Sequence, residues 1–562
     1  MATSMTIESW EDQSFAQRAI SYAVFLLPII YLFFGIDQYA LLNENEGRYA
    51  EIAREMLASG NFIIPHLNGL PYLEKPPLLY YLTTLSFSLF GVNDIAARLV
   101  PISASLLAVG TLAWFGRAVG RPLAGLIAAF VLGSSLGFVL LGNVQMTDSL
   151  YNALWSSALL VAYVGLTRPS SKLMAISYAL LALAVLAKGL VTLVLFYMVL
   201  FPLAWLSRDV TPSQWLKRLF APWPIVVFAV IAVPWHIAAA LSLKEFSWFY
   251  FINEHVYRFT GQRMPKDYYA GGTPLFYVPR LIFLFFPWSI IMLIALIKRQ
   301  ITIDQTDRRL TWFAWLLAGI PTAFFAISSS KADYYVMVAL PGIALVLAQS
   351  LARNWQRSQT FILSSIILCV FGAAFGAWQS WIFAPEGLSS FMPWQLLPSS
   401  PVALAWSVLG GAAALLFWLK RPLFAWLAIG LMFLPLKITL VDALQAKEPH
   451  VSAQNLAGYI KRHHSTVPVM LYRDYELLSS LPFHLEQTIP VVDSVSPDLW
   501  FGQQLGTVPS QFPLSTDLIQ SNRGFLLVVP DRRLQEMAAS PLAPKLSLVT
   551  QIGDARLYRF TP

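Results

Sequence analysis

The charged residues best suited to chemistry gather in one segment, Asn43 to Leu79. Elsewhere the chain avoids charge, with 12% charged residues against 57% hydrophobic residues. Charged groups beside a bilayer are costly, so a functional site is the first hypothesis for them. Glu74 and Lys75 precede Pro76-Pro77, which restrict the backbone and block a helix through the pair. Lys75 could bind a phosphate and Glu74 a divalent metal. The alternative is that the two side chains form only a weak salt bridge at the membrane interface.

The same segment predicts an amphipathic helix. Arg48, Glu51 and Glu55 fall at i, i+3 and i+7, so they share one helical face. Asn45 is a good N-cap residue, and Ser59-Gly60 is a stop signal. We expect this helix either to lie in the plane of the membrane interface or to be a solvated surface helix.

Other polar clusters interrupt the apolar sequence. His255 lies three residues before Arg258 on one helical face, although a lone histidine is more often a hydrogen-bonded structural residue. Asp148 ends one apolar run and opens the next, and its alternative role is an N-cap. Lys331 and Tyr335 follow three serines, and they either begin a helix or face a phosphate-bearing lipid. Carboxylates, cations and one histidine together indicate an acid/base site that handles phosphate, with or without a metal.

The elements that must position these residues are membrane helices. The chain has 562 residues, 19 Trp, 38 Phe and a mean hydropathy of +0.60, which is typical of a polytopic membrane protein. The first apolar run, Ala19 to Ile36, lacks a small-residue cleavage site and is expected to remain as a span. The single Cys369 excludes disulfides and a cysteine metal site. The net charge of +8 is scattered at the ends of apolar runs, so no nucleic-acid partner is expected.

The basic loops predict which apolar runs cross the membrane. Fourteen apolar stretches can be marked, most of them near the roughly 20 residues that a span needs. If the short run 77–92 does not cross, thirteen spans remain and the basic loops all fall on one side. These loops contain Arg117/Arg121, Arg168/Lys172, Arg208/Lys217/Arg218, Lys298/Arg299/Arg308/Arg309, Arg353/Arg357 and Lys420/Arg421. By the positive-inside rule that side is cytoplasmic, together with the N-terminus.

The same arrangement gathers the unusual polar clusters on the outer face. It places there the first loop, 37–95, with Asp148, Lys188 and the 244–273 loop. The transmembrane domain is expected to end at residue 442, and residues 443–562 to form a small soluble α/β domain on the exported side. Its expected strands are Val467–Tyr472, Thr488–Asp493 and Gly524–Pro530, and its expected helices are Ser452–His463 and Arg532–Ala539. Without a recognisable motif, this domain is expected to be structural or to guide an acceptor.

Several motifs resemble a known family. They are NEGRYAEIAREM, LNGLPYLEKPPLLYYL, the Asp148 turn, AKG at 187–189 and SSSKADYY at 328–335. Across roughly residues 19–442 the chain resembles the membrane glycosyltransferases of the GT-C class that use lipid-linked sugars. Within that class it resembles the bacterial transferases that put 4-amino-4-deoxy-L-arabinose on lipid A, and these resemble the protein O-mannosyltransferases. The resemblance implies a bacterial inner-membrane enzyme with thirteen spans, membrane-parallel helices in the first periplasmic loop, and a periplasmic active site.

The resemblance also implies roles for particular residues. Glu74 and His255 match a metal-binding pair, for which Zn or Mg is expected. The groups around the phosphate of a polyprenyl-phosphate sugar donor are Arg48, Lys75, Arg258, Lys331 and Tyr335. The family usually has Asp-Glu in the first loop where this chain has Asn45-Glu46. Because an amide cannot accept a proton, catalytic duty is expected to pass from Asn45 to Glu46 or Asp148.

In the mechanism that this resemblance implies, an acceptor oxygen attacks the anomeric carbon and polyprenyl phosphate leaves. The cations and any metal would stabilise the phosphate charge that develops. A lipid A phosphate, another envelope glycan and protein Ser/Thr are the alternative acceptors, and a monomer is expected. A lipid-linked-glycan flippase is the alternative class, but it would carry charges along a route through the bilayer. This chain keeps its charges at the outer face, with Lys437 as the clearest exception.

Overall fold

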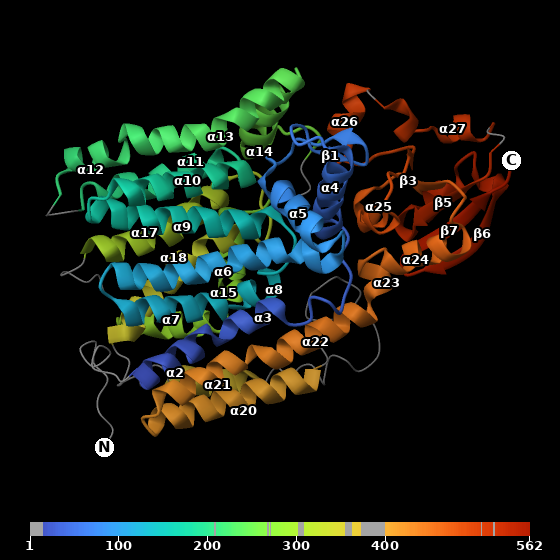
Figure 1. Cartoon of the computed structure of the whole chain (residues 1–562). Coiled ribbons are helices and arrows are strands. Elements are labelled where there is room, and N and C mark those ends of the chain that lie inside the picture. Colours follow the sequence, from blue (N-terminus) through green and yellow to red (C-terminus); the bar gives the residue numbers. More distant parts are fainter. Residues whose placement is uncertain are drawn as a thin grey trace.

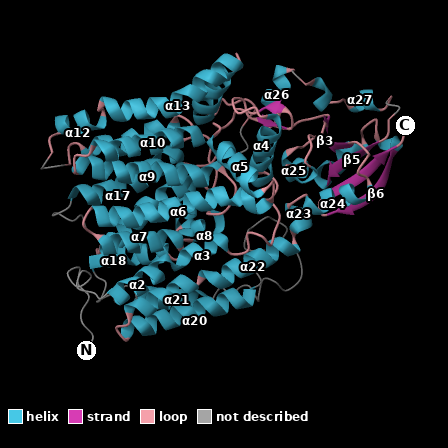
Figure 2. Cartoon of the chain, viewed as in Figure 1, coloured by secondary structure: helices cyan, strands magenta, loops and turns pink. Residues whose placement is uncertain are grey.

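The computed structural model contains a body of roughly parallel helices and, at one end of it, a smaller domain with a β-sheet (Figures 1 and 2). It describes residues 15–206, 210–266, 269, 271–301, 308–353, 362–372, 399–506, 508–520 and 523–562. The first loop of the chain lies between the helical body and the C-terminal domain (Figure 1). This arrangement places the charged segment of the sequence at the junction of the two parts.

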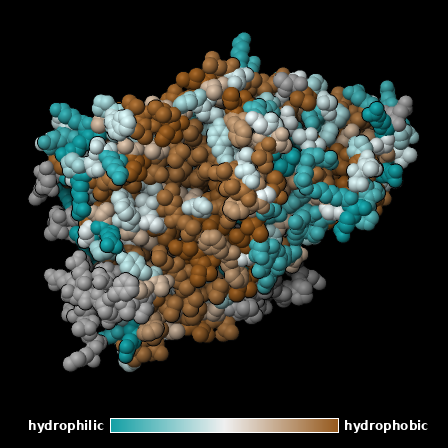
Figure 3. Space-filling model, viewed as in Figure 1, coloured by the Kyte–Doolittle hydropathy of each residue, from teal (hydrophilic) through white to brown (hydrophobic). Residues whose placement is uncertain are grey.

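The helical body is built mainly from apolar helices. Their bounds are α2 (Phe15–Leu26), α3 (Ile30–Phe33), α6 (Asp94–Ala118), α7 (Pro122–Gly133), α8 (Leu136–Leu141), α9 (Thr147–Thr167), α10 (Ser171–Lys188), α11 (Val191–Leu203), α12 (Pro212–Leu219), α13 (Pro222–Ser242), α15 (Tyr277–Leu284), α16 (Trp288–Ile297), α17 (Arg308–Ile327), α18 (Leu340–Arg353), α20 (Ser399–Trp418), α21 (Pro422–Leu431) and α22 (Phe433–Ala446). Figure 3 shows a broad hydrophobic band over these helices, with hydrophilic residues toward both ends. Helices that are apolar all round are buried either by one another or by lipid.

The described helices agree with a polytopic membrane protein. Seven are long and apolar enough to cross a bilayer, and a bent pair, Pro274–Leu284 with Trp288–Ile297, could supply an eighth span. Five shorter apolar helices besides Leu78–Phe90 bring the candidates within the described residues to thirteen, by length and composition. The exact number of spans stays a prediction. The expected basic positions Arg208 and Arg357 lie outside the described residues.

The predicted amphipathic helix is present as α4 (Asn45–Ser59), and Gly60 ends it in the left-handed conformation with φ 67°. The predicted N-cap is wrong. Glu44 occupies the cap position with a positive φ, while Asn45 is already helical and accepts a hydrogen bond from Arg48 Nη2 at 2.7 Å. The asparagine side chain therefore serves the neighbouring arginine rather than the first turn of the helix.

The rest of the first loop returns along α4. A short antiparallel pair, β1 (His66–Leu67) with β2 (Leu70–Pro71), turns through Asn68-Gly69, and both turn residues have positive φ. Asn-Gly is the residue pair that such a two-residue turn favours. The turn N–H groups of Asn68 and Gly69 both donate to the Glu55 carboxylate, at 2.5 and 2.9 Å. Helix α5 (Leu78–Phe90) then packs against α4, where Thr84 donates to Ala53 O at 3.0 Å.

The C-terminal α/β domain was predicted correctly in class. Its five strands, in the order β4-β3-β5-β7-β6, pair in parallel from β4 to β5 and antiparallel from β5 to β6. Their bounds are β3 (Val469–Tyr472), β4 (Val491–Val492), β5 (Phe525–Pro530), β6 (Leu546–Ile552) and β7 (Ala555–Phe560). The helices are α23 (Glu448–Val451), α24 (Gln454–His463), α25 (Ser480–Leu485), α26 (Trp500–Leu505), α27 (Ser515–Leu518) and α28 (Leu534–Ala538). The hairpin of β6 and β7 was not predicted, and α22 continues four residues beyond the predicted boundary at 442.

The C-terminal domain packs directly on α4. A Cβ atom at Gly47 would lie 2.5 Å from Ser480 N, so only glycine permits this approach of α4 to α25. Asn43 Oδ1 accepts a hydrogen bond from Ser480 Oγ at 2.7 Å, and Asn68 exchanges two hydrogen bonds of 2.7 Å with the backbone of Ile489. As a result, Glu51 on the charged face of α4 is fully buried and paired with Arg54, so this face is not solvated.

Candidate active site

A polar cavity of about 560 Å³ lies where α4, the first loop, the 244–273 segment and the C-terminal domain meet. Most of the residues singled out from the sequence line it. They are Asn45, Arg48, Glu74, Lys75, Asp148, Arg258 and Tyr335. Residues that lie far apart along the chain are thus assembled around one space. The charges predicted for the outer face therefore form a site and not a dispersed surface.

Glu46 is the first exception, because it faces away from the cavity and is 1% exposed. Its two carboxylate oxygens accept hydrogen bonds from Arg98 Nε and Nη2, at 3.2 and 2.8 Å. They also accept from the backbone N–H groups of Leu42 and Gln145, each at 3.0 Å. A carboxylate with four donors has no oxygen left for a substrate. This geometry does not support the predicted catalytic role of Glu46, and the carboxylate instead holds the first loop against α6.

Lys331 is the second exception. Its side chain is buried, its Nζ donates to the carbonyl of Ser328, and it lines neither this cavity nor the adjoining one described below. Its own N–H donates to Tyr269 O at 2.8 Å. The ammonium therefore closes its own turn and faces neither cavity, and its predicted contact with a donor phosphate stays a prediction. The turn still matters for the site because Tyr335 follows it and lines the cavity.

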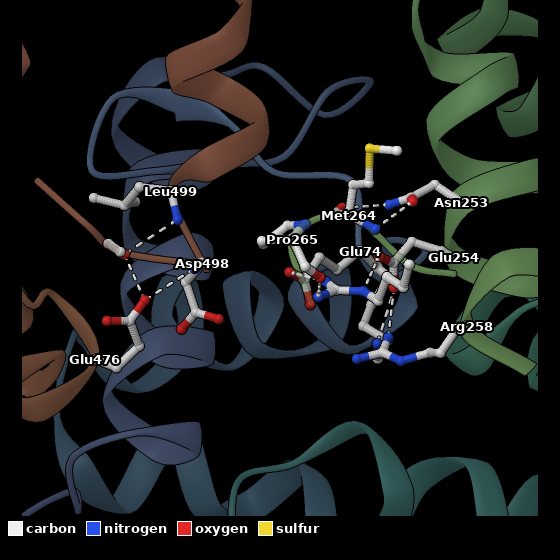
Figure 4. Close-up of polar contacts among 12 residues, drawn as sticks. Glu74, Asn253, Glu254, Arg258, Met264, Pro265, Glu476, Asp498 and Leu499 are labelled. Atoms are coloured by element: carbon white, nitrogen blue, oxygen red, sulfur yellow. Dashed lines mark hydrogen bonds and ion pairs between the residues drawn. The ribbon is translucent and has the colours of Figure 1, made fainter. Parts of the chain in front are cut away.

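A chain of ion pairs connects the first loop to the 244–273 segment (Figure 4). Arg263 donates to Glu74 and to Glu254, each at 2.6 Å, and Arg258 donates to Glu254 at 2.5 Å. Arg258 follows a π-helix, η2 (Trp248–Tyr257), an irregular helix of a kind that is frequent at functional sites. Sequence reasoning missed Arg263 and Glu254. A buried arginine in a loop has no local signature, because its partners come from other segments.

The electrostatics of the Glu74-Lys75 pair follow from this network. Burial alone raises the pKa of Glu74, but Arg263, Lys75 and Arg258 together lower it to about 2, so Glu74 is ionised. Burial and the neighbouring Arg258 lower the pKa of Lys75 to about 8. Lys75 Nζ donates to Glu74 O at 3.2 Å. A lysine that lies in a buried, cationic environment gains most from an incoming anion, so Lys75 suits a phosphate group.

A second cavity, of about 390 Å³ and mainly apolar, adjoins the polar one. Leu190, Val191, Val194, Phe259 and Phe324 contribute apolar walls. The two cavities share four lining residues, Glu74, Lys75, Arg258 and Tyr335. An apolar space that meets a polar one at a cluster of cations suits an amphiphile with a phosphate headgroup.

Asp148 lines the polar cavity and is ion-paired with Lys188, which lines the apolar one. Lys188 Nζ also lies 4.5 Å from the ring centroid of Tyr335 and 5.0 Å from that of Tyr151. Helix α10 ends at this lysine, whose side chain is 9% exposed and also lies over the ring of Phe325. Asp148 is thus a cavity residue whose charge is already balanced, and its predicted role as a base stays a prediction.

The C-terminal domain supplies one wall of the polar cavity. Arg48 donates to Asp498 at 2.5 Å, and Glu476, Asp474 and Arg533 also line the space. Sequence reasoning gave this domain a structural or acceptor-guiding role and named no residue in it. The acidic residues carry no motif, and only the packing of the domain on α4 brings them to the site.

Glu74 and His255 do not fit the divalent metal expected from the sequence. His255 Nε2 accepts from Leu190 N at 2.9 Å, and its Nδ1 lies 2.6 Å from Tyr250 O, so both ring nitrogens have protein partners. A Cβ atom at Gly189, which has φ 98°, would overlap His255 Nε2, so the histidine packs tightly on this turn. The described residues contain no group of three or more His, Cys, Asp or Glu side chains that could hold a metal. The geometry supports a structural histidine.

The chain is similar to several known proteins. A family model described as dolichyl-phosphate-mannose-protein mannosyltransferase matches residues 74–238. A protein of Enterobacter sp. (strain 638), named undecaprenyl phosphate-alpha-4-amino-4-deoxy-L-arabinose arabinosyl transferase, is 26% identical over 411 residues, 70% of this chain and 72% of that protein. A protein of the same name from Aeromonas hydrophila is 29% identical over 332 residues, and the alignment covers 57% of this chain and 58% of that protein.

The solved structures decide the fold. The crystal structure of ArnT from Cupriavidus metallidurans in the apo state superposes with a TM-score of 0.80 at 23% identity, over 97% of this chain and 98% of that one. The structure of the same protein bound to undecaprenyl phosphate gives a TM-score of 0.79 at 24% identity, with the same coverage of each chain. This chain has the ArnT fold. The GT-C fold class predicted from the sequence is confirmed, and so is the resemblance to glycosyltransferases that use lipid-linked sugars.

Proposed function

We propose that this protein is a glycosyltransferase that takes a sugar from a polyprenyl-phosphate carrier at the end of the helical body that bears the C-terminal domain. The proposed sugar is 4-amino-4-deoxy-L-arabinose, as the names of the relatives suggest. The proposed acceptor is a phosphate of lipid A, which rests on the sequence resemblance. Another envelope glycan and protein Ser/Thr are the alternatives that the assay below distinguishes.

The observation that carries this proposal is the meeting of two cavities at Lys75, Arg258 and Tyr335. The apolar cavity suits the isoprenoid chain of the carrier, and the polar cavity suits its sugar. The carrier phosphate would then lie at their junction, where Lys75 is buried beside Arg258. Cations that are preorganised in a buried site stabilise phosphate charge far more than they would in water.

The chemistry that we propose is a single displacement. An acceptor oxygen forms a bond to the anomeric carbon while the bond between that carbon and the phosphate oxygen breaks. The electron pair leaves with the polyprenyl phosphate, and Lys75 and Arg258 balance the charge that develops there. A phosphate monoester on the acceptor is largely ionised at pH 7, since its second pKa is about 6. Asn45, which cannot accept a proton, is compatible with such an acceptor.

We also infer the orientation in the membrane. The basic residues Arg117, Arg168, Lys217 and Lys420 lie at or next to the C-terminal ends of α6, α9, α12 and α20, and these helix ends lie opposite the C-terminal domain (Figure 1). The positive-inside rule would place this end in the cytoplasm and the cavity in the periplasm of a bacterial inner membrane. We also propose that the protein acts as a monomer, as expected from the sequence.

The test is transfer by the purified full-length protein from undecaprenyl-phosphate aminoarabinose to lipid A, with the product measured by mass spectrometry. We expect modified lipid A with the wild type and strongly reduced transfer with Lys75→Met. Lys217→Met is the matched control, because Lys217 is exposed at the opposite end of the helical body. Transfer to another glycan or to a peptide hydroxyl, with lipid A unmodified, would show that the acceptor is not lipid A. Failure to use any polyprenyl-phosphate sugar would refute the function.

A further inference from the structure

The C-terminal wall of the polar cavity contains two buried carboxylates that lack a full set of partners. Glu476 is 9% exposed, and the side chain of Asp498 is 8% exposed. One oxygen of Glu476 accepts from Ser496 Oγ at 2.5 Å and from Asp498 N at 2.9 Å, while Asp498 Oδ1 accepts from Arg48 at 2.5 Å. Within the described part of the chain, Glu476 Oε2 and Asp498 Oδ2 are buried and have no hydrogen-bond partner.

Buried carboxylate oxygens without donors are unusual in proteins and call for an explanation. Burial together with the charge of Asp498 raises the pKa of Glu476 to about 7, and burial raises the pKa of Asp498 despite its pair with Arg48. Burial is the largest cause of both shifts, and a neighbouring carboxylate adds to each of them, Asp498 at Glu476 and Glu74 at Asp498. A cationic group in the cavity would relieve both.

Both walls of the cavity carry charges of both signs, and the two groups of carboxylates lie on opposite sides (Figure 4). The C-terminal wall holds Asp474, Glu476 and Asp498 together with Arg532 and Arg533. Glu476 and Asp498 lie on the C-terminal side, whereas Arg258 lies across the cavity with Glu254 and Glu74. Lys75 and Arg263 add positive charge to that far wall. A ligand with an anionic group at one end and a cationic group at the other would match both walls. A sugar phosphate that bears an amine is such a ligand.

We propose that Glu476 and Asp498 bind the ammonium group of an amino sugar on the donor, and that the C-terminal domain thereby selects amino sugars over neutral ones. This inference rests on the proposed function, because it places the donor phosphate at Lys75 and Arg258. An ammonium group has three donors, so it can satisfy both free oxygens at once. A divalent ion is a poorer match, since the described residues hold no cluster of three metal-ligating side chains here and Asp498 is already paired.

The test compares two donors that differ only at the amine. One carries the free amine and the other carries the same amine as an N-acetyl amide, which is neutral. The readout is the ratio of kcat/KM for the two donors within each variant, so a loss of folded protein cancels. We expect the wild type to favour the free amine roughly ten- to hundredfold, which is the range for a hydrogen-bonded charged group. We expect Glu476→Gln and Asp498→Asn each to reduce that ratio toward one.

Glu486→Gln is the matched control, because Glu486 is an exposed carboxylate of the same domain that pairs with Lys461. It should leave the donor ratio unchanged. An unchanged ratio in Glu476→Gln and Asp498→Asn, or equal use of both donors by the wild type, would overturn the inference while leaving the glycosyltransferase function in place. Tight binding of Mn²⁺ that is lost in Glu476→Gln would also overturn it. If the wild type transfers sugar from neither donor, the proposed function is wrong, and the inference that rests on it is wrong too.

Discussion

Replacing Glu46 by glutamine should destabilise the protein and not merely slow a reaction. Each carboxylate oxygen of Glu46 faces two N–H donors, one from Arg98 and one from the backbone of Leu42 or Gln145. Whichever oxygen becomes the NH₂ group of glutamine will therefore meet two donors. The Arg98 guanidinium, which is fully buried, would keep the backbone carbonyls of three residues but lose its only charged partner among the described residues.

The cost of breaking a buried ion pair by removing one partner is about 3–5 kcal/mol. We therefore expect the purified Glu46→Gln protein to lose its folded, monodisperse form at a clearly lower temperature than the wild type, as measured by fluorescence-detected size exclusion after heating. Glu245→Gln, a change at an exposed carboxylate, should not shift that temperature. The double variant Glu46→Gln/Arg98→Met should be more stable than the sum of the single effects predicts, because no unpaired charge remains. A Glu46→Gln protein of wild-type stability that has lost transfer activity would refute this reasoning and restore a catalytic role.

Three further predictions concern the site and the junction of the two parts. The pKa of Lys75 is lowered to about 8, so its ammonium is charged below that pH. The kcat/KM for a phosphate-bearing donor should therefore fall as the pH rises through about 8, and Lys75→Arg should remove this pH dependence. Gly47→Ala would place a Cβ atom 2.5 Å from Ser480 N, and this overpacking should lower the stability of the junction by about 1–3 kcal/mol. The measurement is proteolytic release of the C-terminal domain, which should become faster; an unchanged cleavage rate would contradict the close packing. Removal of divalent metals by a chelator should leave transfer unchanged, because His255 and Glu74 already have protein partners. Activity that is lost on chelation and regained with one metal ion would support the metal site predicted from the sequence.

The sequence by itself determined the features that depend on neighbouring residues. Long apolar runs specify membrane helices, because a backbone in lipid must satisfy its own hydrogen bonds. The spacing of Arg48, Glu51 and Glu55 and the stop at Gly60 were enough to place α4, and alternation along the chain was enough to find three of the five C-terminal strands. Most of the residues that the sequence singled out do line the cavity, because charges are rare in this chain and those kept at one face stand out.

Tertiary structure alone decided what each charge does. Glu46 and Asn45 are adjacent in the sequence, yet one is sealed by Arg98 and the other lines the cavity. Successive residues of a helix point about 100° apart, so neighbours meet different surroundings. Arg48 pairs with Asp498, and Glu74 pairs with Arg263. Neither partner has a sequence motif around it, and both reach the site only when distant segments pack together. Caps and periodicity act within a few residues, whereas ion pairs depend on which segments pack together, and that is the information a single sequence does not display.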